Sequence, residues 1–146
     1  MLFILIVVAF HEVFSQKKNQ LAVHGSYTFE TYDGQKNIAV YMSFFNNSDQ
    51  DVLIDSFSSD LSSRIEMHDI QFKNDIAKMV MIKEVVIKGK SELYLQPGGK
   101  HLMFFGIKEK LSDGDSFEIQ VNFKNGTSQK VKTMVLSKDL KSNYLN

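Results

Sequence analysis

The chain of 146 residues contains no cysteine, so it can form neither a disulfide nor a thiolate metal site. It has a single proline and no net charge, because its 17 basic residues balance its 17 acidic ones. Without an excess of positive charge, no field of the whole molecule attracts nucleic acid or an anionic membrane surface. Any binding of a soft metal must therefore use methionine sulfur and histidine nitrogen.

The motifs of common enzyme classes are also missing. The sequence has no nucleophile elbow, no phosphate-binding loop and no HExxH zinc helix. Serine, histidine and aspartate are all present, but no local pattern joins them into a catalytic triad. We therefore predict that the protein is not an enzyme, and regard a hydrolase or an oxidase as a disfavoured alternative.

A long hydrophobic run is found only at the N-terminus, where nine apolar residues extend from Leu2 to Phe10. The run is shorter than the roughly 20 residues of a membrane-spanning helix, and its length is typical of the apolar part of a secretory signal peptide. We predict a signal peptide over residues 1–15, retained as an anchor if it is not cleaved, and a periplasmic domain over residues 16–146. No basic residue precedes the run, so a buried N-terminal strand is the alternative.

The rest of the chain is a series of short apolar segments separated by turn signals. Phe117, Ile119, Val121 and Phe123 alternate with polar residues, which is typical of a strand with one buried face. About seven to nine short strands without a helical period predict a single all-β domain, an antiparallel β-sandwich. The other expected strands are 38–45, 52–57, 64–72, 77–82, 84–87, 92–95, 101–107 and 131–136.

Two pairs of histidine and methionine are spaced so that strand geometry brings their side chains together. His101 and Met103 are two residues apart, so on a strand both face the same side. If the turn at Lys73-Asn74 closes a two-residue hairpin, His68 stands opposite Met79, with Cβ atoms about 5 Å apart. Imidazole and thioether donors suit copper(I) far better than Mg, Ca or Mn. Core methionines and hydrogen-bonded histidines are the structural alternative.

The complete spacing resembles the ligand signature of the periplasmic copper chaperones called PCuAC. Ten residues separate His68 from Met79, twenty-one separate Met79 from His101, and one separates His101 from Met103. These are the intervals of the family motif His-x10-Met-x21-His-x-Met. The Pro-Gly-Gly turn within Leu95–Met103 is similar to the family's most recognisable stretch. Other similar segments are Ala39–Met42, Ile65–Asp69, Gly106 and Leu111–Asp115, so the resemblance covers about residues 36–136.

This resemblance implies a fold, a metal and a function. The fold is a cupredoxin-like Greek-key sandwich with copper(I) near the surface at one end, and the implied ligands are His68, Met79, His101 and Met103. The function is delivery of copper(I), by a monomer, to an acceptor protein: the copper A subunit of cytochrome c oxidase or an assembly factor. A periplasmic copper buffer with the same site, or an immunoglobulin-like interaction domain without metal, is the alternative.

The chain departs from the family pattern at several positions. Val80-Met81 stands where Arg-Pro is common, which leaves Met81 as an alternative thioether. The tail from residue 137 to 146 has no histidine or methionine, so we expect no second, copper(II) site. Met42 lies in an apolar strand and is expected in the core. Because an acceptor must reach the metal, we expect the four ligands at an exposed rim, apart from that core.

Overall fold

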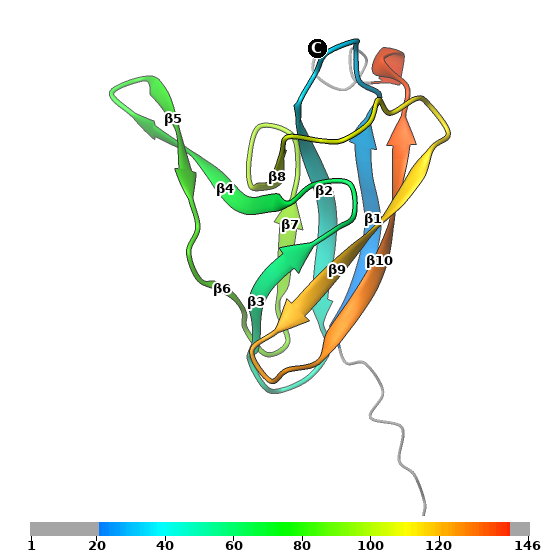
Figure 1. Ribbon diagram of the computed structural model, residues 1–146. Coiled ribbons are helices and arrows are strands. Elements are labelled where there is room, and N and C mark those ends of the chain that lie inside the picture. The colour runs from blue at the N-terminus through cyan, green and yellow to red at the C-terminus, as the bar shows by residue number, and fades with distance from the viewer. Residues whose placement is uncertain (1–20, 141–146) are drawn as a thin grey trace, which may run out of the picture.

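The computed structural model describes residues 21–140, and β-strands make up most of that range (Figure 1). The predicted signal peptide, residues 1–15, lies outside the described residues. Within them, no helix is both long enough and apolar enough to cross a membrane. The strands are β1 (Leu21–Phe29), β2 (Asn37–Asn46), β3 (Val52–Ser58), β4 (Arg64–Lys73), β5 (Ile76–Met81), β6 (Val85–Ile87), β7 (Glu92–Leu95), β8 (His101–Phe105), β9 (Ser116–Phe123) and β10 (Ser128–Leu136).

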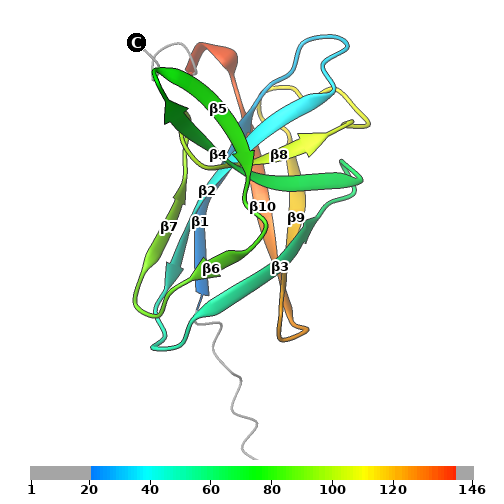
Figure 2. The same cartoon turned by 90° about the vertical axis from the view of Figure 1, so that its left-hand side faces the viewer.

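These strands form one continuous sheet that folds back on itself into a sandwich. Their order is β5-β4-β8-β2-β1-β10-β9-β3-β6, with β7 paired to β2. Two strands pair with β2 in succession, β8 with its first half and β7 with its second half. Seen from the side of β5, β7 and β2 lie on one side of the molecule and β9 and β3 on the other (Figure 2). The predicted all-β sandwich is confirmed.

Strand β1 is an element that the sequence pattern did not predict. Its alternation is interrupted at Gly25, which has a φ of 61°, and its register with β2 shifts between His24 and Tyr27. A bulge of this kind breaks the two-residue period by which a strand is recognised. Strand β1 also pairs in parallel with β10, whereas the other pairings among the described strands are antiparallel. The expected antiparallel sandwich thus contains one parallel pair, β1 with β10.

The core lies between the layers and is built mainly from alternate residues of the strands. On β9, Ile119 and Val121 are fully buried, and Phe117 packs against the same cluster. Met42 is 1% exposed, so its predicted place in the core is confirmed. The largest side chains that are fully buried are Phe44, Phe104, Met42, Ile87, Leu102 and Ile107. None of the four predicted ligands belongs to this hydrophobic cluster.

The last part of β4 and the whole of β5 leave the sandwich as a two-stranded hairpin, residues 70–81, which we call the arm (Figure 1). Its turn is formed by Asn74 and Asp75, whose φ angles are 51° and 61°. A hairpin turn with positive φ at both central residues favours asparagine and aspartate over lysine. The turn predicted at Lys73-Asn74 is therefore wrong by one residue, because it lies at Asn74-Asp75. As a result, each residue of β4 pairs with the β5 residue two positions later than predicted.

Stability should depend on the core and not on the outward-facing positions of the same strands. We expect Ile119→Ala to lower the free energy of unfolding by about 2–5 kcal/mol, because the residue is fully buried. The matched control is Lys132→Ala on the exposed side of β10, which should change it by less than about 0.5 kcal/mol. Urea denaturation of both variants measures the difference, and equal losses would contradict this assignment of the core.

Candidate metal centre

Three side chains from β8, β4 and β5 stand in one row across the sheet. His68 pairs with His101 on one side and with Met81 on the other, and directly paired residues project from the same face. The imidazole centroids of the two histidines are 5.8 Å apart. Met103, which pairs with Glu66, lies on the same face two residues along β8. We call this side of β8, β4 and β5 the ligand face.

The structure therefore places three of the four predicted ligands, His68, His101 and Met103, next to one another. The fourth, Met79, lies farther along the arm than we had expected. We had expected Met79 to pair with His68, but it pairs with Ile70. It still projects from the ligand face, because it is two residues from Met81 on the same strand. Direct partners in an antiparallel pair have Cβ atoms about 4.5–5.5 Å apart, against about 7–8 Å for diagonal neighbours. The alternative thioether Met81 is thus the direct neighbour of His68.

The donors on the ligand face differ in their exposure. His68 and His101 are only 9% and 5% exposed, whereas Met79 and Met81 are 51% and 44% exposed. The expectation that all four ligands lie at an exposed rim is wrong for the histidines. Their rings pack edge to face on each other, and the His68 ring also lies 6.0 Å from that of Phe105. The nitrogen donors are therefore buried below the surface, whereas the sulfur donors of the arm lie at the surface.

Hydrogen bonds determine which ring nitrogen of each histidine keeps a lone pair. His101 Nδ1 lies 2.9 Å from the carbonyl oxygen of Gly99, and His68 Nε2 lies 2.9 Å from a carboxylate oxygen of Glu66. Both oxygens accept, so both of these nitrogens donate. In a neutral ring the other nitrogen is then an acceptor. The free lone pairs are consequently on His101 Nε2 and on His68 Nδ1.

His68 Nδ1 is buried and has no hydrogen-bond partner within the described residues. Leaving such an acceptor unpaired costs about 1–3 kcal/mol. A metal ion binds a lone pair of this kind, and metal-bound histidines usually donate their other ring nitrogen to a carboxylate or a backbone carbonyl. Both histidines already have that arrangement. With the thioethers of the ligand face, their nitrogens make a donor set that suits a soft cation.

The residues around the histidines hold them in this geometry. Glu66 also lies 3.9 Å from Arg64 Nε, and the Arg64 guanidinium stacks 3.8 Å from the ring centroid of Phe105. An ion pair of 3.1 Å between Asp69 and Lys100 joins β4 to the residue that precedes His101. Sequence reasoning missed Glu66. Its position two residues before His68, on the same face of a strand, was the available signal.

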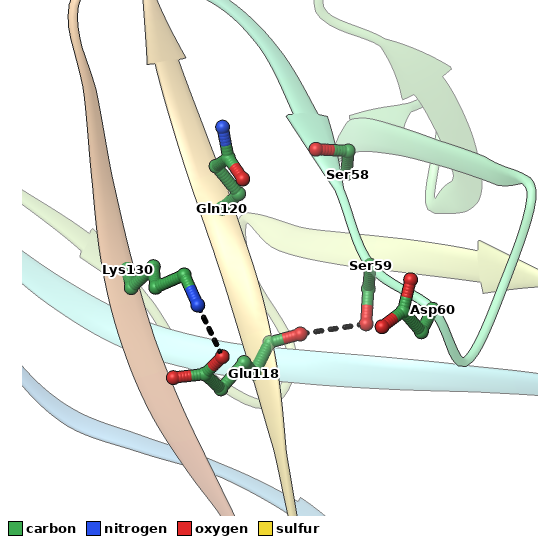
Figure 3. A pocket seen from close by; sticks show the side chains of 6 residues that line it. All are labelled: Ser58, Ser59, Asp60, Glu118, Gln120 and Lys130. Carbon is green, nitrogen blue, oxygen red and sulfur yellow. Dashed lines mark hydrogen bonds and ion pairs between the residues drawn. The ribbon is translucent and has the colours of Figure 1, made fainter.

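Two surface cavities can be compared with this site. One of about 240 Å³ lies between β3, β4 and the segment after β5, and Glu66 and Met81 are among its lining residues. The other, of about 190 Å³, is lined by Ser58, Ser59, Asp60, Glu118, Gln120 and Lys130 (Figure 3). There Glu118 pairs with Lys130 at 2.9 Å, and Ser59 donates to the Glu118 carbonyl at 2.7 Å. Its serine and carboxylate groups thus form no set of metal donors comparable to the ligand face.

Fold and site together define a β-sandwich with imidazole and thioether donors on one face. The chain belongs to the LpqE-like family, described as "Putative lipoprotein LpqE-like", whose model matches residues 21–135. It is 29% identical over 100 residues to the uncharacterized protein RP573 of Rickettsia prowazekii, covering 68% of this chain and 55% of that protein. It is also 31% identical over 75 residues to the putative lipoprotein Lxx21020 of Leifsonia xyli, and this match covers 51% of this chain and 45% of that protein. The chain spans about half the length of these relatives.

Solved PCuAC domains share the fold. The copper-bound PCuAC domain from PmoF2 superimposes with a TM-score of 0.68 at 14% identity, over 81% of this chain and 93% of that domain. The copper(I) form of DR1885 from Deinococcus radiodurans gives 0.66 at 23% identity, over 84% of this chain and 81% of that one. The resemblance to PCuAC domains is thus confirmed in the fold.

The hydrogen bonds of the two histidines predict opposite tautomers. His68 should carry its proton on Nε2 and His101 on Nδ1, because these nitrogens face Glu66 and the Gly99 carbonyl. Long-range nitrogen–proton NMR spectra of the metal-free protein at mildly alkaline pH distinguish the two forms. Glu66→Ala should release the preference at His68 and leave His101 unchanged. The same tautomer at both rings would contradict this assignment of the lone pairs.

Proposed function

We propose that this protein binds one copper(I) ion on the ligand face and passes it to an acceptor protein in the periplasm. The observation that carries the proposal is the unpaired, buried Nδ1 of His68 beside a second histidine and a row of methionines. Copper(I) is a soft cation that accepts neutral nitrogen and sulfur ligands. The copper-bound PCuAC domain from PmoF2 and the copper(I) form of DR1885, which share the fold, support the choice of metal.

The proposed ligands are His68 and His101 through nitrogen, and Met103 and one methionine of the arm through sulfur. Met79 is the arm ligand that the PCuAC signature implies. The observed pairing favours Met81, because it is the direct partner of His68. The flexible thioether chain allows either residue to reach the metal, and paired variants distinguish them.

The arrangement suits a protein that gives up its cargo and performs no catalysis. All proposed ligands are neutral, so the charge of copper(I) is left uncompensated and transfer to a thiolate acceptor is favourable. The buried histidines would bind the metal from the side of the protein, and the thioethers of the arm are exposed to an approaching protein. The acceptor implied by the resemblance is the copper A centre of cytochrome c oxidase. The family's lipoprotein description supports a place outside the cytoplasm.

Removing single sulfur atoms tests the ligand set. Replacing methionine by leucine keeps the volume, so stability should change by less than about 1.5 kcal/mol. We expect Met103→Leu and Met81→Leu each to lower copper(I) affinity by at least the roughly tenfold that a lost supporting group costs a metal site. The loss should be smaller for Met79→Leu. Competition with a chromophoric copper(I) chelator, under anaerobic reducing conditions, measures all three.

Met134→Leu is the matched control, because Met134 lies on β10, outside the ligand face, and is 39% exposed. It should bind copper(I) like the unaltered protein. Binding should also weaken in acid, since protons compete for the imidazole nitrogens. Unchanged affinity in both Met103→Leu and Met81→Leu would contradict the proposed site. A larger loss of copper(I) affinity in Met79→Leu than in Met81→Leu would show that Met79, and not Met81, is the arm ligand.

A further inference from the structure

The arm has an apolar face and a polar face, although it covers no core. Pairs Ile70–Met79 and Phe72–Ala77 alternate with pairs Gln71–Lys78 and Lys73–Ile76. Because paired residues share a face and successive pairs alternate, the first two pairs lie on the same side as His68 and Met81. That side of the arm contains no charged residue. We call it the arm face.

The apolar side chains of the arm face are open to solvent. Phe72 is 72% exposed and Met79 is 51% exposed, and Figure 1 shows the arm projecting away from the sandwich. A two-stranded ribbon cannot bury such residues by itself. A contiguous exposed apolar surface usually marks an interaction site, and this one begins at a candidate metal ligand.

We infer that the arm face is the docking surface for the protein that receives the metal. The inference rests on the proposed function and adds the place and chemistry of the partner's contact. The partner that fits has an apolar centre, an acidic rim and a thiolate metal site at the edge of its own surface. Copper stays at +1 in the exchange. A copper–thioether bond breaks as a copper–thiolate bond forms, and the thiol proton passes to solvent.

Continuity with the ligand face is the first argument for this partner. The row His101, His68 and Met81 leads without a gap to Met79 and then to Phe72 at the end of the arm. A protein seated on the arm face therefore lies against the exposed thioethers. The buried histidines lie next to them in the same row, so the acceptor's ligand approaches from the side of the most accessible donors.

Charge is the second argument. Residues 70–84 contain Lys73, Lys78 and Lys83 against two carboxylates, Asp75 and Glu84, and Lys73 and Lys78 lie on the polar face of the arm. Within the described residues, none of these three lysines forms an ion pair. The chain as a whole is neutral, so the positive charge is local to the arm and its base. Complementary charge of this kind steers an acidic partner and speeds its association.

The arm offers a matched pair of variants. Phe72 and Ile76 are 72% and 70% exposed and lie near the same turn, but on opposite faces. Threonine keeps a high strand propensity at either position. The full chain loaded with copper(I) is mixed with the metal-free copper A domain of cytochrome c oxidase, and transfer is timed. A parallel reaction uses bathocuproine disulfonate, a small chelator that needs no docking surface.

Phe72→Thr should slow transfer to the copper A domain by about tenfold or more, as expected for a central interface residue. Its transfer to the chelator and its copper(I) affinity should not change. Ala77→Glu, on the same face, should act likewise, and Ile76→Thr should behave as the unaltered protein. Transfer to the domain should also slow as salt is raised.

Several results would overturn the inference. Equal transfer rates for Phe72→Thr and Ile76→Thr would show that the arm face is not used. A lower copper(I) affinity in Phe72→Thr would make the residue part of the metal site instead. A concentration-dependent dimer that Phe72→Thr abolishes would assign the face to a second copy of the chain. Copper(I) binding without any transfer to the domain would refute this partner and leave the proposed metal site intact, whereas failure to bind copper(I) would refute the proposed function itself.

Discussion

The position of β4 between β8 and β5 is the constraint on which the site depends. Met67 and Leu102 pair with each other and are buried in the core, which forces His68 and His101 onto the opposite side of the sheet. A slip of β4 by one residue would exchange its two faces and place His68 in the core, away from His101. The apolar packing that stabilises the sandwich thus also fixes the row of donors, without using any of them as core residues.

Local hydrogen bonds then turn a row of side chains into a set of directed lone pairs. The turn Pro97-Gly98-Gly99 requires a φ of 78° at Gly98, a conformation that glycine adopts without strain, and it presents the Gly99 carbonyl to His101. Glu66 does the same for His68 from a neighbouring position on β4. The nitrogens are oriented before any metal binds, while the arm's thioethers stay exposed and adaptable. This division between a fixed inner half and a flexible outer half suits the proposed delivery of a metal ion.

Most of the fold could be predicted from the sequence, because alternation and turn residues mark the strands from β2 onward. Strand β1 could not, since Gly25 breaks its period, and its parallel pairing with β10 joins the two ends of the described range, which no local pattern reports. Strand spacing together with the resemblance to the PCuAC signature singled out His68, His101 and Met103, and the sheet brings them onto one face. The register of the arm was not predicted correctly, because it depends on whether Lys73 or Asp75 adopts a positive φ angle. Glu66 was missed because its role depends on side-chain orientation.

The central claim is that the ligand face holds copper(I) by imidazole nitrogen and thioether sulfur. X-ray absorption at the copper edge of the copper(I)-loaded protein tests it most directly, because scattering from sulfur differs from that of nitrogen and oxygen. The account predicts two nitrogen and two sulfur neighbours, with one sulfur lost in Met103→Leu. A spectrum with only nitrogen and oxygen neighbours, or one that Met103→Leu leaves unchanged, would contradict it.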